Sequence, residues 1–275
     1  MTIIAVAVSL YLPNMYRAEA LVAPVTDDSA SGLAALAGRY QGLADLAGIN
    51  LGERETDKTA LGIEVLKSRK FISNFIKNRN ILVPLVAAKN WDRASGVLTI
   101  DDEVYDPTSK QWVRDVTPPQ TPQPSDQEAY RLFADHLSVD EDPNTGFVRI
   151  SYDHLSPNLA QDWVTWLVED LNSTIMQRDV AEAERAIDYL YTQIEATSVA
   201  DLHNVFFGLI EEQTKTIMLA KMSPEYMFRT IDPPVAPELK SSPNRPLIVA
   251  LGLVFGGLVG LIAVILMGAL GGYRD

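Results

Sequence analysis

The feature that most constrains this chain is an uncharged apolar run near its C-terminus, from Leu247 to Leu270. As a helix, this run of about 24 residues extends roughly 36 Å, which exceeds the ~30 Å hydrocarbon thickness of a bilayer. A buried core helix is the alternative, but core helices rarely continue this far without a charge. The sequence therefore predicts a transmembrane helix over 247–270, followed by a short tail over 271–275.

A proline-rich segment, 233–246, comes directly before the predicted span. Proline fixes φ at about −65° and removes a backbone donor, so such a segment favours extended chain. We expect it to act as a semi-rigid spacer that holds the folded part of the chain at a fixed height over the membrane. The candidate functional residues here are Pro233, Pro234, Pro237, Pro243 and Pro246.

Three glycines recur at every fourth position of the predicted span, namely Gly252, Gly256 and Gly260. Glycines on one face of a membrane helix allow a second helix to approach closely, because van der Waals packing replaces the hydrophobic driving force in lipid. Composition alone is the other explanation, since glycine is common in membrane helices. We expect this face to pack against another helix.

The N-terminal segment 1–12 is apolar but too short to cross a bilayer. A secretory signal is one interpretation, although no basic residue precedes the apolar stretch. The interpretation we favour is the outer half of a first transmembrane helix that begins upstream. The chain would then be anchored at both ends, with the N-terminal anchor truncated.

Composition excludes several classes of partner and site. The formal net charge is −13, and an acidic chain repels nucleic acid, so no nucleic-acid partner is expected. The chain has no cysteine, which excludes disulfides, zinc–thiolate sites and cysteine nucleophiles.

Residues 13–232 mix strand and helix signals, which predicts an α+β domain. Alternation predicts a strand from Tyr16 to Val22 and another over 225–232. Ser125 and the glutamate three residues later form a capping-box pattern that opens a short helix. The turn sequence DPNTG, 142–146, predicts a hairpin that leads into a strand over 148–152.

The helical signals are longer. Helical periodicity predicts a helix that ends near Gly48, and one or two helices over 56–80 with Leu61 on the buried stripe. The longest periodic segment, 156–197, has Ser156 as its cap and Pro157 at its first position, and it extends about 60 Å. We expect this helix to project outward or contact another subunit. A second helix, over 199–222, is predicted to double back along it.

No catalytic constellation is visible. None of the three histidines, His136, His154 and His203, lies in a metal-binding or catalytic motif, and each is expected to be a surface or hydrogen-bonded residue. Phosphate-binding glycine loops are also absent from the sequence. Carboxylates are too numerous for any pair to indicate a glycosidase. The sequence therefore predicts a non-enzyme without cofactor or metal.

Four stretches together resemble the bacterial polysaccharide co-polymerases, the Wzz-type chain-length determinants. The most specific is the proline-rich entry into a glycine-rich membrane helix, because this combination is unusual outside the group. The others are an exit from a first membrane helix into a strand, a segment rich in glycine and alanine, and a helix containing SR and F with a tryptophan downstream. In order along the chain they are LPNMYRAEALVAP (12–24), SGLAALAGRYQGLADLAGINLG (31–52), LKSRKFISNFIKNRNILVPLVAAKNWD (66–92) and FRTIDPPVAPELKSSPNRPLIVALGLVFGGLVG (228–260).

The resemblance implies an α+β periplasmic domain with a small membrane-proximal sheet and a very long projecting helix, anchored in the bacterial inner membrane. It also implies a ring-shaped homo-oligomer that works with a separate membrane polysaccharide polymerase. Its function would be non-catalytic control of the modal chain length of a lipid-linked surface polysaccharide such as O-antigen. Whether the lipid-linked glycan is contacted directly stays open. A structural adaptor of a polysaccharide export complex is the alternative, and a periplasmic glycan hydrolase is a third.

The resemblance also implies that the tail over 271–275 is cytoplasmic. One observation disagrees with this orientation. Lys240 and Arg245 precede the final span, whereas Arg274 alone follows it. Counting positive charges would place the C-terminus outside, while the resemblance implies the reverse. Two charges against one is a small difference, so we follow the resemblance.

Overall fold

The structure is a computed structural model, and it describes residues 9, 11–25, 53–197, 200–254 and 256. Helices and strands are mixed along these residues, which confirms the predicted α+β class. The elements in chain order are β1 (Tyr16–Pro24), α4 (Glu53–Lys67), α5 (Arg69–Asn78), α6 (Leu82–Val86), β2 (Ala88–Asp92), β3 (Val97–Ile100), β4 (Tyr105–Asp106), β5 (Gln111–Trp112), α7 (Asp126–Ala134), β6 (Leu137–Glu141), β7 (Val148–His154), α8 (Pro157–Ala196), α9 (Ala200–Met222) and β8 (Phe228–Asp232).

The main sheet has four strands in the order β6-β7-β1-β8, and every pairing is antiparallel. Its central strand β1 alternates between buried and accessible residues, and its inward side chains are the predicted Tyr16, Ala18, Ala20 and Val22. The outer face carries cross-strand ion pairs instead. One joins Arg17 to Asp153 at 2.6 Å. This division follows from the two-residue period of a strand, which places one face on the core and the other in water.

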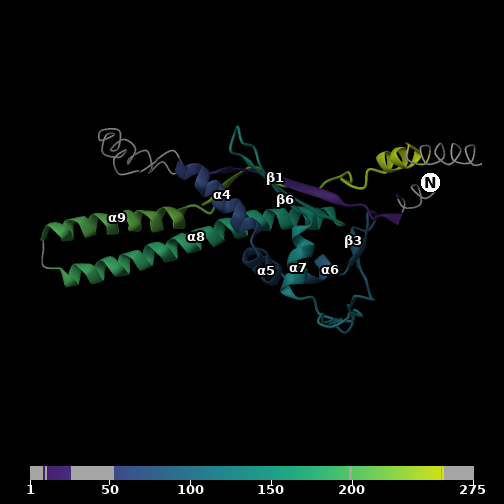
Figure 1. Cartoon of the computed structure of the whole chain (residues 1–275), viewed down its shortest axis with the longest axis horizontal. Coiled ribbons are helices and arrows are strands. Elements are labelled where there is room, and N and C mark those ends of the chain that lie inside the picture. The colour runs from purple at the N-terminus through teal and green to yellow at the C-terminus, as the bar shows by residue number, and fades with distance from the viewer. Residues whose placement is uncertain (1–8, 10, 26–52, 198–199, 255, 257–275) are drawn as a thin grey trace, which may run out of the picture.

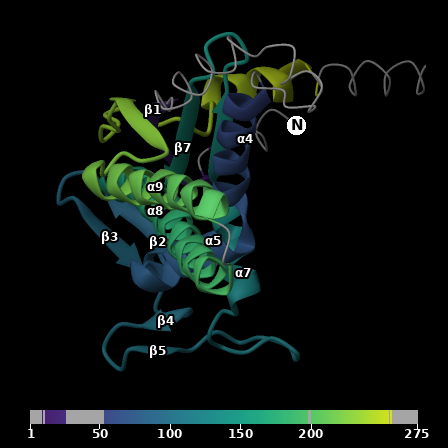
Figure 2. The ribbon, with the colours of Figure 1, turned by 90° about the vertical axis from the view of Figure 1, so that its left-hand side faces the viewer.

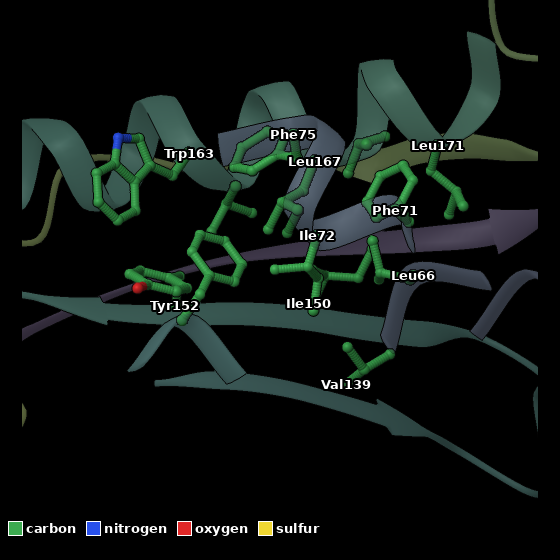
Figure 3. Packing of buried hydrophobic residues seen from close by; sticks show 14 of the residues in the cluster. Leu66, Phe71, Ile72, Phe75, Val139, Ile150, Tyr152, Trp163, Leu167 and Leu171 are labelled. Atoms are coloured by element: carbon green, nitrogen blue, oxygen red, sulfur yellow. The ribbon is translucent and has the colours of Figure 1, made fainter. Parts of the chain in front are cut away.

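The core lies between the inner face of this sheet and the first half of α8, with α5 and α7 closing its side (Figure 3). Aromatic rings dominate its centre. The Phe133 ring lies 4.6 Å from that of Tyr152, 5.4 Å from that of Phe75 and 5.8 Å from that of Trp163. Aromatic pairs at such centroid distances stabilise a core beyond their area of burial.

The local signals that begin the helices act as the sequence predicts. The Ser156 hydroxyl accepts a hydrogen bond from Leu159 N–H at 3.4 Å, and Pro157 occupies the first turn of α8. The Ser125 hydroxyl accepts from Glu128 N–H at 3.2 Å at the start of α7. The hairpin between β6 and β7 is also confirmed, and its Gly146 has the positive φ, 69°, that favours glycine.

The predicted helical region over 56–80 is two helices divided at Ser68, whose side chain caps α5. The expectation that Leu61 lies on the buried stripe is wrong, since this side chain is 41% exposed. The buried face of α4 instead contains Ile63 and Leu66. The four-residue spacing from Leu61 to Val65 predicts a helix, but it does not determine which face of that helix packs on the core. The predicted helix that ends near Gly48 lies outside the described residues.

Two small hairpins between α6 and α7 were not predicted. β2 pairs with β3, and β4 pairs with β5 over two residues only. Figure 2 shows both hairpins beside the main layers, with β4 and β5 farthest from the sheet. Trp91 of β2 anchors the first hairpin through an edge-to-face contact with Tyr16, at a centroid distance of 5.2 Å.

The second half of α8 leaves the core and runs side by side with α9 (Figure 1). The 40-residue length of α8 and the return of the chain along α9 were both predicted. This helical hairpin extends in the direction opposite to the start of β1 and to the short helix at residues 245–254 (Figure 1). None of the helices within the described residues is long and apolar enough to cross a membrane. The span predicted over 247–270 lies mostly outside those residues.

Candidate functional site

The two ends of the folded part meet in a short junction, which we call the clasp and define as residues 14–17, 153 and 241–245. Met15 N–H donates to the Ser242 carbonyl at 2.9 Å, and Ser241 N–H donates to the Met15 carbonyl at 2.8 Å. The reciprocal pair forms an antiparallel bridge. Residues separated by more than 220 positions in the sequence are thereby held together at one place.

A single arginine strengthens the clasp. Arg245 Nε donates to the Ser9 carbonyl at 3.1 Å, and Arg245 Nη2 donates to Asn14 Oδ1 at the same distance. Arginine suits this role because its planar guanidinium offers several donors in a fixed geometry. In the sequence, Arg245 stands out only as a charge before the predicted span. Its position at the start of an uncharged run was the available signal, but its partners are more than 230 residues away.

The clasp is also tied to the sheet. The Ser241 hydroxyl donates to Asp153 Oδ1 at 3.0 Å and to the Met15 carbonyl at 3.1 Å. Asp153 in turn accepts two bonds from Arg17, and this hydrogen bonding raises the pKa of the Arg17 guanidinium. The arginine therefore stays charged, and the carboxylate is held between β1 and the returning chain.

The predicted prolines lie along the path from β8 to the clasp. Residues 233–241 form neither helix nor strand. Pro234 is buried, and its carbonyl accepts a hydrogen bond from Gln161 Nε2 of α8 at 3.0 Å. Pro246 lies in the first turn of the helix at 245–254, whose cap is Asn244, and proline is tolerated there because those N–H groups have no partner inside the helix. The remaining three, Pro233, Pro237 and Pro243, are exposed or half-buried.

The predicted glycine face is described only in part. Gly252 and Gly256 both lie in helical backbone, one turn apart and so on one face of the helix. Gly260 lies outside the described residues. Packing of this face against a second helix stays a prediction.

A buried histidine lies at the end of β7, close to the start of α8. His154 Nε2 lies 3.1 Å from the Pro84 carbonyl, and its Nδ1 accepts the Ser156 N–H at 3.0 Å. Burial lowers the pKa of His154, while the hydrogen bond with the Pro84 carbonyl opposes that shift. The neutral ring therefore joins β7, α6 and the cap of α8.

The other two histidines are bonded to backbone carbonyl groups. His136 Nδ1 lies 2.9 Å from the Leu132 carbonyl, and His203 Nε2 lies 2.8 Å from the Thr197 carbonyl. Each imidazole thus has a backbone partner. In the parts of the chain that the structure describes, no group of three or more histidine and acidic side chains could hold a metal ion.

The projecting hairpin exposes an unusual amount of apolar surface. α9 buries one stripe, which includes Ile210 and Ala220, against α8. Large apolar side chains also lie on its outer faces, and both helices of the hairpin contribute: Tyr189, Tyr191, Leu202, Val205, Phe207, Leu209, Met218, Leu219 and Met222. Many exposed large apolar side chains along one element are typical of a surface that other protein covers.

No protein-family model and no curated protein matches the chain. One similar solved structure is a full-length bacterial polysaccharide co-polymerase, which is 13% identical, has a TM-score of 0.35, and is matched over 100% of this chain and 94% of that chain. Another is a fragment of WzzB, a polysaccharide co-polymerase from Salmonella Typhimurium, also 13% identical, with a TM-score of 0.28 over 83% of this chain and 100% of that chain.

Both of these structures bear the name of the family that the sequence resembles. At this identity, and with TM-scores below 0.5, they assign no role to any residue of this chain.

Proposed function

We propose that the chain is a non-catalytic regulator of the modal length of a lipid-linked surface polysaccharide. It would act at the bacterial inner membrane with most of the chain in the periplasm. The observation that carries this proposal is the clasp, which joins both ends of the folded part at the end opposite to the helical hairpin (Figure 1). This geometry suits a domain that is anchored twice at one surface and reaches away from it.

The exposed apolar surface of the hairpin supports a homo-oligomer. Monomeric soluble proteins rarely expose large contiguous apolar patches, so repeated subunits are a ready explanation for this surface. A ring of identical chains would cover it with the neighbouring hairpin. Such a ring would present the clasp end of every subunit to a separate membrane polymerase. A polymerase is the partner that the family resemblance implies.

The proline segment supports a fixed position of each domain over its membrane helix. Pro234 is held against α8, and the following residues end in the clasp, so the segment has little freedom to change its length. We expect P233A/P234A/P237A to broaden or shift the glycan length distribution. P122A in the exposed connector before α7 is the matched control, and it should leave the distribution unchanged. An unchanged distribution in the triple variant at normal protein level would argue against the spacer role.

The deciding experiment is a gel of surface polysaccharide from cells that lack this protein, with and without its restoration. Regulated length appears as a clustered ladder, and we expect the cluster to disappear with the protein and return with it. A ladder of unchanged pattern but reduced surface amount would instead favour the adaptor of an export complex. Shortening of purified glycan by the purified protein would favour a hydrolase.

A further inference from the structure

A polar groove lies between α5 and α8. Its volume is about 760 Å³, which is within the range of small-molecule and oligosaccharide pockets. At one end Arg79 Nη2 bonds Asp170 Oδ1 at 2.6 Å. Arg178 also lines the groove. It lies about two helical turns after Asp170 on α8, so the groove extends for roughly 12 Å along that helix.

Uncharged polar side chains are the largest group in the lining. Phe71 and Phe75 supply an apolar floor from the core side. Amide and hydroxyl groups occupy the walls, three from each side: Ser68, Asn74, Asn78, Ser173, Thr174 and Gln177. Each amide can donate and accept at once, and each hydroxyl can do the same. A ligand rich in hydroxyl groups matches this lining, because its groups also donate and accept.

Several of these groups are free to take a ligand. Asn74 and Asn78 lie one turn apart on α5, are exposed, and make no side-chain hydrogen bond with another described residue. By contrast, Gln177 already donates to the Ser173 hydroxyl at 2.9 Å, and Ser68 caps α5. The two asparagines are therefore the principal candidates for ligand contacts.

The charges in the groove exclude other ligand classes. Arg79 is neutralised by Asp170 and Glu169, and Arg178 is paired with Asp179. Lys70 is then the one lining cation that has no ion pair among the described residues. A single unpaired lysine is too little for a polyphosphate, which needs several convergent donors. The polar walls equally disfavour an apolar helix from a second copy.

We propose that this groove binds a short stretch of oligosaccharide, with Asn74 and Asn78 bonding its hydroxyls. The identification of that oligosaccharide with the polysaccharide whose length is regulated rests on the proposed function. Contact with the growing chain would give the regulator a direct way to respond to it.

The test is binding of the full chain, purified in detergent, to polysaccharide released by mild acid from the surface of the source cells. Affinity would be measured by calorimetry and contacts by saturation-transfer NMR. N74A/N78A should bind roughly tenfold more weakly, since it loses two hydrogen bonds of ordinary net strength. Alanine is a better helix former than asparagine, so this variant should melt no lower than the parent. The matched control N158A/N204A, which removes exposed amides from α8 and α9 outside the groove, should bind as the parent does.

Three results would overturn the proposal. They are absence of binding by the parent at millimolar glycan, equal affinity of N74A/N78A, and a change in its oligomeric mass, which would make the groove a subunit contact. The gel of surface polysaccharide keeps this proposal separate from the proposed function. If N74A/N78A restores the normal length cluster and binds as the parent does, the groove proposal fails while length control stands. If the parent itself restores no cluster, length control fails, and calorimetry still decides whether the groove binds glycan.

Discussion

The first and second halves of α8 lie in opposite environments. From Ala160 to Ile175 the helix is covered by the sheet and by α5, and Trp163, Leu167 and Leu171 are fully buried (Figure 3). Beyond that point its main neighbour among the described residues is α9, and its buried residues fall to Ala183 and Leu190. One continuous helix thus belongs both to a compact core and to an open hairpin.

The difference separates two sources of stability. The core that contains the main sheet and the first half of α8, which we call the base, is stabilised within the chain. Its apolar side chains are covered from several directions. The hairpin leaves many large apolar side chains exposed, so under the proposed function a further part of its stability would come from another subunit. Substitutions in the base should therefore change the unfolding of the chain itself, whereas substitutions on the hairpin should change its assembly.

The largest effect is expected for W163A in the base. Trp163 is fully buried and contacts Phe133, Tyr152 and His154, so its truncation leaves a large cavity. We expect the free energy of unfolding to fall by ~3–5 kcal/mol, measured by urea denaturation followed by circular dichroism. Y191A on the distal half of α8, where the ring is 51% exposed, should change it by less than about 0.5 kcal/mol. Similar losses of stability for W163A and Y191A would contradict the division of α8 into a buried first half and an exposed second half.

The next effect concerns the polar link between α8 and β8. Asn172 is buried, and its Oδ1 accepts the N–H groups of Met227 and Phe228 at 2.7 and 2.8 Å. Its Nδ2 donates to the Phe228 carbonyl at 3.0 Å. N172L keeps the volume but leaves three backbone groups without partners, which should cost about 2–3 kcal/mol. N204L on the exposed face of α9 is the control, and an equally stable N172L would show that the buried groups find other partners.

A smaller effect is expected from pH at His154. Burial lowers the pKa of this ring in the folded state, so between its ordinary pKa of about 6.5 and the folded value the unfolded chain binds more protons. The stabilisation is complete above that ordinary pKa and is lost as the pH falls through this window. The neighbouring titratable groups are His136, whose charge lowers the pKa of His154 further, Asp153 beside it in β7, and Tyr152.

The measurement is urea denaturation of the parent and of H154Q at a series of pH values below 7. The parent should lose stability as the pH falls, while H154Q should show a flatter dependence, because it cannot take up the proton. H203Q, which changes a histidine near the hairpin tip, should keep the slope of the parent. A parent slope that survives in H154Q would assign the pH dependence to other groups.

The sequence predicts the base better than it predicts the clasp. β1, the β6–β7 hairpin and the caps of α7 and α8 follow from alternation, turn chemistry and capping residues, all of which are local. The clasp depends on Ser241 and Arg245 meeting residues near the other end of the chain, and no local pattern indicates such a contact. β4 and β5 were missed because two-residue strands have no period to detect. The polar groove was missed because helical Asn74 and Asn78 look like ordinary solvent-exposed residues.

The smallest effect on the chain itself is expected for V205D/L209D on α9. These side chains are 56% and 41% exposed and lie one turn apart, so aspartate at both positions leaves the core and the α8 contact intact. We expect the free energy of unfolding under monomeric conditions to change by less than about 0.5 kcal/mol.

Assembly should respond strongly to the same double substitution, because a charge buried at a subunit contact without a partner is costly. Sedimentation of the detergent-solubilised full chain should show a large oligomer for the parent and a much smaller species for V205D/L209D. K215D reverses a charge at an exposed position of the same helix and should leave the mass unchanged. If V205D/L209D keeps the parent mass, the apolar surface of the hairpin is covered by something other than a second copy. The hairpin would then depend on a different protein for its cover, while the base would still be stable by itself.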